Sequence, residues 1–222
     1  MIGQQQKDQA EKWFKDLRDK ICEEFEILEE DHLKLAPKSD VAAKKFERKS
    51  TIRETDDKED GGGGVMATLK GGRIFEKVGV NVSAVYGNLA PEAQKSITAR
   101  KAIPELKDDP RFWASGISLV AHMRNPHTPA IHLNTRMFWT PHAWWFGGGT
   151  DLNPSIQNDE DTNFFHQTLK KKCDAHNKTY YKKFKEWADE YFFIPHRKVA
   201  RGVGGIFFDD LCTGDWEKDF SF

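Results

Sequence analysis

The sequence predicts an α+β fold: an antiparallel β-sheet with α-helices packed on it, in a single domain of residues 1–222. Two observations lead to this prediction. Between residues 61 and 151, apolar and polar residues alternate with the period of two that is typical of strands. Near both ends of the chain, apolar residues instead recur at intervals of three and four, as on one face of a helix. A chain of 222 residues is long enough to bury one substantial core.

Residues 1–36 are expected to form an N-terminal helix. From about Gln6 to Lys34, the residues with helical spacing are Trp13, Leu17, Ile21, Phe25 and Leu28. Such an apolar stripe needs a partner surface, which a sheet can provide. The next segment, from Pro37 to Asp60, is charged and mostly polar, and either a short edge strand or an ordered loop fits it.

Four consecutive glycines, Gly61 to Gly64, open the predicted core sheet of residues 61–151. Neither Lys-Ser nor Lys-Thr follows them, so they indicate a bend or a close backbone approach rather than a phosphate-binding loop. Two strands are expected next, at about residues 64–69 and 74–86. Residues 91–109 are expected to form a short helix or a loop.

Polar side chains gather on one face of a hairpin predicted between Gly116 and Arg136. The face expected in the core carries Ile117, Leu119, Ala121, Met123, Ile131, Leu133, Thr135 and Met137. The other face carries Ser118, His122, His132, Asn134 and Arg136. The turn sequence Asn125–Pro129 makes the two strands antiparallel neighbours. A plain solvated face is the alternative, but imidazoles, an amide and a guanidinium without Lys or Glu favour a ligand site.

The C-terminal third is expected to combine helices with one more strand. Residues 159–190 carry aromatic residues at broadly helical intervals, which predicts one or two helices with a break near Cys173. Residues 201–211 contain three glycines before Ile206 and two phenylalanines, a pattern that indicates a further strand.

Composition excludes several classes of function. The formal net charge of −1 and the absence of a basic stripe argue against a nucleic-acid partner. No stretch of sequence is long and apolar enough for a membrane span, and the N-terminus lacks a secretory apolar core. Three widely separated cysteines fit a reducing compartment. A cytoplasmic location is therefore expected, with the mitochondrial intermembrane space as the alternative.

Four segments together resemble a known enzyme family. The segments are GISLVAHMRNPHTPAIHLNTRMF, WWFGGGTDLNP, EWADEYFFIPHR and RGVGGIFFDDL, and they occur between residues 116 and 211. They resemble oxygen-dependent coproporphyrinogen-III oxidase, and the likeness extends from about Gly61 onward. The resemblance implies a large curved antiparallel sheet flanked by helices and a homodimer. It also implies that the chain lacks the C-terminal part of the family fold.

The resemblance further implies an activity. Coproporphyrinogen III would be the substrate and molecular oxygen the co-substrate, with no cofactor required. Two propionate side chains would become vinyl groups with loss of carbon dioxide, giving protoporphyrinogen IX for haem biosynthesis.

Specific residues match functional positions of the family. The substrate-binding positions are Ser118, Asn134, Thr135 and Arg136, and Arg201 is a second guanidinium suited to a propionate. His132 matches a proton donor, and Asp151 matches an acidic position that engages the pyrrole N–H groups. The expected catalytic residues are therefore His132, Asp151 and Arg136. For Asp151, capping of a turn before Pro154 is the structural alternative.

A metal site is the least favoured reading of the histidines. His122, His132, His166 and His196 match positions sometimes assigned to a divalent metal, but they form no HxH or HExxH pattern. Two alternative functions stay open at this point. One is a metal-dependent oxygenase that uses these histidines, and the other is a catalytically incomplete relative that binds a tetrapyrrole or serves in dimerisation.

Overall fold

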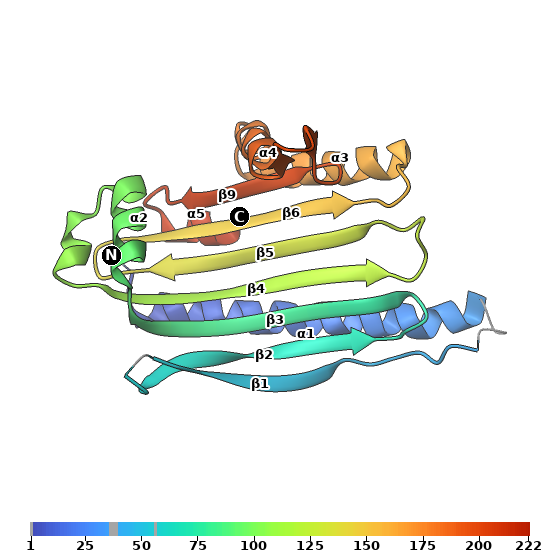
Figure 1. The fold of residues 1–222 in the computed structure, drawn as a ribbon, viewed down its shortest axis with the longest axis horizontal. Coiled ribbons are helices and arrows are strands. Elements are labelled where there is room, and N and C mark those ends of the chain that lie inside the picture. Colours follow the sequence, from blue (N-terminus) through green and yellow to red (C-terminus); the bar gives the residue numbers. More distant parts are fainter. Residues whose placement is uncertain (1, 36–39, 56) are drawn as a thin grey trace.

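The computed structural model describes residues 2–35, 40–55 and 57–222. Within them lie one seven-stranded antiparallel sheet, one two-stranded sheet and five α-helices, so the predicted α+β class is confirmed. The strands of the large sheet are β1 (Glu47–Glu54), β2 (Asp60–Lys70), β3 (Phe75–Asn88), β4 (Arg111–Met123), β5 (Ala130–Trp139), β6 (Trp144–Asn153) and β9 (Gly205–Leu211). The first six pair in chain order, and β9 adds to the edge at β6 (Figure 1).

The segment left open between an edge strand and a loop contains the edge strand β1. All eight of its residues are exposed, because β1 pairs only with β2 and no helix covers it. Residues 37–39 and 56 of the same segment lie outside the described part of the chain. The glycine run is part of β2, where a Cβ on Gly63 or Gly64 would strike backbone oxygens of the neighbouring strands. These glycines therefore serve close backbone approach.

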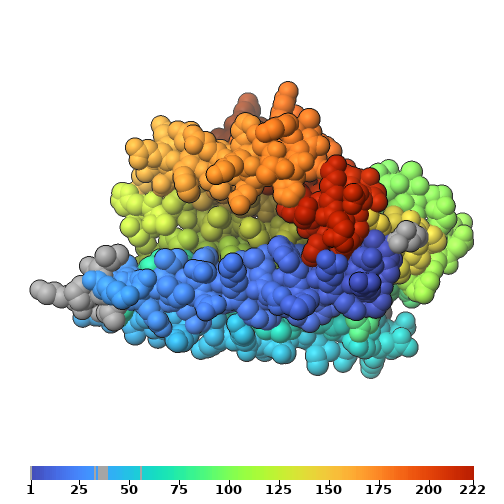
Figure 2. Space-filling model, turned by 180° about the vertical axis from the view of Figure 1, so that it is seen from behind, coloured from blue at the N-terminus to red at the C-terminus, as the bar shows by residue number. Residues whose placement is uncertain are grey.

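Helix α1 (Gln4–Leu35) covers one face of the sheet and supplies much of its core. It runs the length of the molecule behind β3 and β4 (Figures 1 and 2). Phe14 is 2% exposed, and Phe25 stacks on Phe75 of β3 with ring centroids 4.6 Å apart. Of the predicted apolar stripe, Leu17, Ile21 and Phe25 pack against the core, whereas Trp13 and Leu28 are 44% and 47% exposed, so that part of the prediction is wrong. Phe14 and Cys22, outside the predicted stripe, are buried in the core and complete the apolar face that stabilises a mostly charged helix.

The remaining helices border the ends of the sheet. Helix α2 (Pro91–Lys101) and the 3-10 helix η1 (Pro104–Lys107) connect β3 to β4, and α3 (Asp159–His176), α4 (Tyr180–Tyr191) and α5 (Trp216–Ser221) surround β9. Helix α3 continues through Cys173, so the interruption lies at residues 177–179 rather than near Cys173. The short strands β7 (Phe193–Ile194) and β8 (Val199–Ala200) form the two-stranded sheet. No helix of the described chain is long and apolar enough to cross a membrane.

One buried carboxylate ties α1 to the β2–β3 turn. Glu29 is fully buried and accepts bonds from the backbone amides of Lys44, Arg73, Ile74 and Phe75. Gly72 leaves space for this carboxylate, because a Cβ there would overlap it. The Glu29 carboxylate thus supplies hydrogen-bond acceptors for backbone amides of the β2–β3 turn, which no neighbouring strand provides.

We expect Glu29→Ala to destabilise the fold by about 3 kcal/mol, because several buried amides lose their acceptor at once. Urea unfolding followed by circular dichroism measures the loss. Glu24→Ala, at an exposed position of the same helix, is the matched control and should change stability by less than about 0.5 kcal/mol. Equal effects of the two substitutions would contradict the role assigned to Glu29.

Candidate functional site

Two hollows lie on opposite faces of the same three strands. The apolar hollow, of about 540 Å³, is lined from one side of β5, β6 and β9 and by α1, α3 and α5. The polar hollow, of about 630 Å³, is lined from the other side of these strands and from β3 and β4. The alternation along β5 separates them, since Leu133 borders only the first and His132 only the second. Both fall within the roughly 300–1,000 Å³ typical of small-molecule sites.

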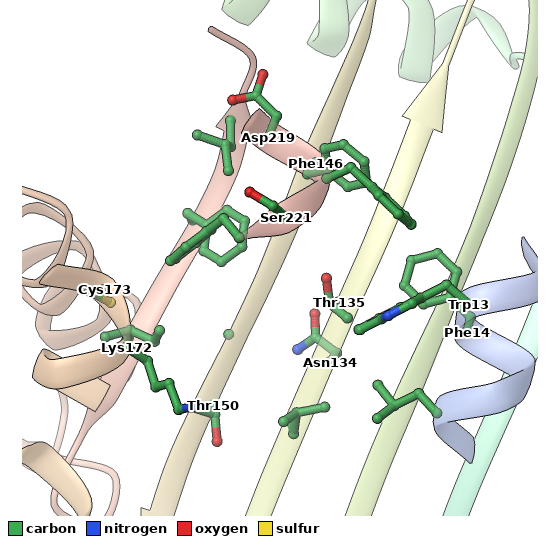
Figure 3. Close-up of a pocket in the computed structure, with 18 of the residues that line it drawn as sticks. Trp13, Phe14, Asn134, Thr135, Phe146, Thr150, Lys172, Cys173, Asp219 and Ser221 are labelled. Carbon is green, nitrogen blue, oxygen red and sulfur yellow. The ribbon is translucent and has the colours of Figure 1, made fainter. Parts of the chain in front are cut away.

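All seven residues predicted to bind substrate or to act in catalysis line the polar hollow: Ser118, His132, Asn134, Thr135, Arg136, Asp151 and Arg201. Thr135 borders both hollows, and its hydroxyl is seen among the side chains of the apolar hollow (Figure 3). This follows from the alternation, because Thr135 has the parity of the core residues of β5. The seven predicted residues thus surround one hollow, although the Thr135 side chain points to the opposite face of β5 from His132, Asn134 and Arg136.

Strand register arranges the polar side chains in rows across the sheet. Ser118 of β4 faces Asn134 of β5, which faces Gly149 of β6. In the next row His132 faces Asp151. Because directly opposed residues have Cβ atoms only about 5 Å apart, each row brings side chains from successive strands into contact. The site is therefore built by pairing rather than by loops.

Asp151 is the buried centre of one polar cluster. Its side chain is 2% exposed, and Oδ2 accepts bonds from Arg201 Nε at 3.1 Å, Arg201 Nη2 at 2.9 Å and Asn153 Nδ2 at 2.6 Å. His132 Nδ1 lies 3.3 Å from Oδ1. Arg201 in turn lies over the ring of Phe192 at 4.3 Å. A carboxylate held in this way orients the imidazole through its Nδ1 atom.

Arg136 belongs to a second cluster. Its Nη1 donates to Asn134 Oδ1 at 2.7 Å, and its Nη2 donates to Asp209 Oδ1 at 2.6 Å. Asp209 is also bound by Arg100 of α2, at 2.6 Å. Counting both clusters, three guanidiniums face two carboxylates, so the two clusters together carry excess positive charge and suit an anionic ligand.

The histidines do not form one metal site. His122 and His132 have ring centroids 6.0 Å apart. His166 is engaged at both ring nitrogens, by the Tyr181 hydroxyl at 3.1 Å and the Val203 carbonyl at 2.9 Å. His196 lies in the exposed turn between β7 and β8. Across the described residues, no three His, Cys, Asp or Glu side chains are close enough to share a metal ion.

Comparison with known proteins settles the family. A family model described as Coproporphyrinogen III oxidase matches residues 9–222. The chain belongs to the coproporphyrinogen III oxidase family. It is 46% identical over 216 residues to the oxygen-dependent coproporphyrinogen-III oxidase of Rickettsia peacockii, covering 97% of this chain and 72% of that relative. The enzyme of the same name from Rickettsia bellii is 43% identical over 221 residues, covering 100% of this chain and 74% of that relative.

Several residues in and beside the hollow of this family member were not predicted from the sequence. Asn153 and Asp209 complete the two polar clusters, and Tyr191 and Phe207 stack with centroids 4.3 Å apart on its wall. The sequence did contain an indication for Asp209. Alternation along β9 places it on the same face as Phe207, opposite to the core residues Ile206 and Phe208. Nothing local marked Asn153, whose partners His132 and Asp151 are defined only by strand pairing.

We expect Arg201→Ala to destabilise the protein by about 2 kcal/mol, because the nearly buried Asp151 carboxylate loses a charged partner. Thermal or urea unfolding provides the measurement. Arg197→Ala, in the same loop region and exposed, is the control and should be close to neutral. In an Asp151→Asn background the cost of Arg201→Ala should largely disappear. A cost that persists there would contradict the pairing.

Proposed function

We propose that this chain catalyses the oxygen-dependent oxidative decarboxylation of coproporphyrinogen III to protoporphyrinogen IX, in haem biosynthesis. The observation that carries the proposal is the polar hollow, which is lined by all the residues predicted to bind substrate or to act in catalysis. The names of the curated relatives support the same activity, since both are oxygen-dependent coproporphyrinogen-III oxidases.

Guanidiniums bind the propionates of the substrate. Arg136 and Arg201 line the hollow about the two polar clusters, and each can hold a carboxylate through parallel N–H bonds. Ser118 and Asn134 add neutral hydrogen-bonding groups in the row between them. The aromatic wall of Tyr191 and Phe207 gives the flat macrocycle an apolar surface.

Each decarboxylation is a two-electron oxidation. A propionic side chain, –CH2–CH2–COOH, loses a hydride equivalent from its β-carbon and a proton from its acid, and the Cα–carboxyl bond breaks to give –CH=CH2 and CO2. Molecular oxygen takes the two electrons and two protons and leaves as H2O2. The electron-rich pyrrole can react with oxygen once its N–H is polarised, so the reaction needs no bound cofactor.

Asp151 and His132 handle the protons. The Asp151 carboxylate accepts pyrrole N–H groups and draws electron density into the ring, and His132 exchanges protons through its imidazole. In the free protein Arg201 covers Asp151. A propionate that binds Arg201 uncovers this carboxylate for the pyrrole, so binding and activation of the substrate are coupled.

The proposal includes the setting of the enzyme. We place it in the cytoplasm, supported by bacterial relatives and by the exposed free thiol of Cys212, which suits a reducing compartment. A homodimer is proposed on the family resemblance, and sedimentation velocity tests it. Coproporphyrinogen III and oxygen are the small-molecule partners.

Aerobic incubation with freshly reduced coproporphyrinogen III, in chelator-treated buffer, tests the activity. Chromatography of the oxidised porphyrins should show the tricarboxylic intermediate and then protoporphyrin, with H2O2 formed in step. Binding without turnover would instead identify a catalytically incomplete relative. Activity that needs one added metal would identify the metal-dependent oxygenase.

We expect Arg136→Ala to raise KM about tenfold or more, because a charge-assisted carboxylate contact is lost. Asp151→Asn should mainly lower kcat, by about 100-fold, because the group that polarises the pyrrole loses its charge. Steady-state kinetics with the same chromatographic assay separates the two effects. Arg197→Ala is the control for both variants. Wild-type kinetics in both would disprove the assignment of the hollow.

A further inference from the structure

Asp209 joins three elements of the fold around the substrate-binding Arg136. The Arg136 guanidinium of β5 reaches Asp209 of β9, although β6 lies between these strands. The other oxygen of Asp209 binds Arg100 of α2, more than one hundred residues away in the sequence. Asp209 is 19% exposed, whereas Arg136 is 38% exposed. Both side chains line the hollow, and the carboxylate is the less exposed of the two.

Gly147 makes this contact across β6 sterically feasible. It is the β6 partner of Arg136 in the strand register. A Cβ on Gly147 would lie 2.7 Å from Asp209 Oδ1 and 3.1 Å from Arg136 Nη2. Any side chain there would push the two groups apart. Because Gly147 has no side chain, Arg136 and Asp209 can form their ion pair across β6.

The charges of the cluster leave Arg136 able to bind an anion. The bonds to Asn134 and Asp209 use two of the five N–H donors of a guanidinium. Asp209 shares its single negative charge between Arg136 and Arg100, so the three groups together carry a net positive charge. A carboxylate held by one arginine alone would neutralise it and compete with a ligand. Shared between two arginines, it fixes Arg136 without cancelling the cluster's charge.

We propose that Asp209, held by Arg100, is a positioning residue that sets the Arg136 guanidinium in the orientation that binds a substrate carboxylate. This inference rests on the proposed function for the identity of the ligand. Asp209 acts through Arg136 and not on the reacting atoms. Its effect on binding must therefore vanish when Arg136 is absent. A purely structural link between α2 and β9 would instead act independently of Arg136.

A double-mutant cycle on ligand binding tests the proposal. The Kd of coproporphyrin III, the stable oxidised form, is measured by fluorescence titration for wild type, Asp209→Asn, Arg136→Ala and the double variant. Asp209→Asn should weaken binding about tenfold in the wild-type background, as expected for a charge-assisted contact. In the Arg136→Ala background it should change Kd by less than about twofold. Asp210→Asn, the same substitution at the exposed neighbour, should leave Kd unchanged in both.

Gly147→Ala provides a second route to the same answer if Asp209→Asn folds poorly. It inserts a methyl group between the paired side-chain ends, and it should weaken binding in wild type but not in the Arg136→Ala background. Equal losses with and without Arg136, or no loss from either substitution, would overturn the proposal. Turnover is measured separately. A wild-type chain that binds coproporphyrin III with the predicted coupling but forms no product would disprove the activity and leave the role of Asp209 intact.

Discussion

The antiparallel register between β5 and β6 is the constraint on which the rest of the site depends. It sets His132 opposite Asp151 and Arg136 opposite Gly147. A slip of one residue would send each of these side chains to the other face of the sheet, among the aromatic residues of α1 and α5. Burial of the core-facing residues opposes such a slip. Met137 of β5 and Ile117 of β4 are almost fully enclosed, and a slip would expose residues of this kind. The same β5–β6 register therefore determines both the packing of the core and the arrangement of the site residues.

The Gly147–Gly149 run leaves the centre of β6 without side chains on either face of the sheet. Gly149 borders both hollows, and a Cβ there would meet Phe207 and the Ile206 carbonyl of β9. Without side chains in this part of β6, residues of β5 and β9 can approach each other across it. The resulting polar surface is a platform of backbone and short side chains bordered by guanidiniums. Such a platform suits a flat ligand whose charges lie at its periphery.

The two faces of the sheet differ in polarity. The face toward α1 contains aromatic and aliphatic side chains, and burial there raises the pKa of the Cys173 thiol to about 11, so this thiol stays protonated at neutral pH. The opposite face gathers ion pairs that are partly open to solvent, such as Arg201 with Asp151 and Arg136 with Asp209. In these pairs the carboxylates lie recessed, and the arginines keep further N–H donors for an anion. The proposed function uses this second face for binding, orientation and proton transfer.

The sequence by itself determined the fold class, the polar face of the β4–β5 hairpin and, mainly through its family motifs, seven of the residues that border the polar hollow. Periodicity suffices for this because a strand's alternation assigns each residue to a face without knowledge of its neighbours. Only the tertiary structure decided which charges meet. Asp151 pairs with Arg201 fifty residues later, and Asp209 joins Arg136 to Arg100. Such contacts depend on strand order and on which side chains meet beside Gly147. The glycine itself is visible in the sequence, but its neighbours are not, because they belong to strands that meet only when the sheet assembles.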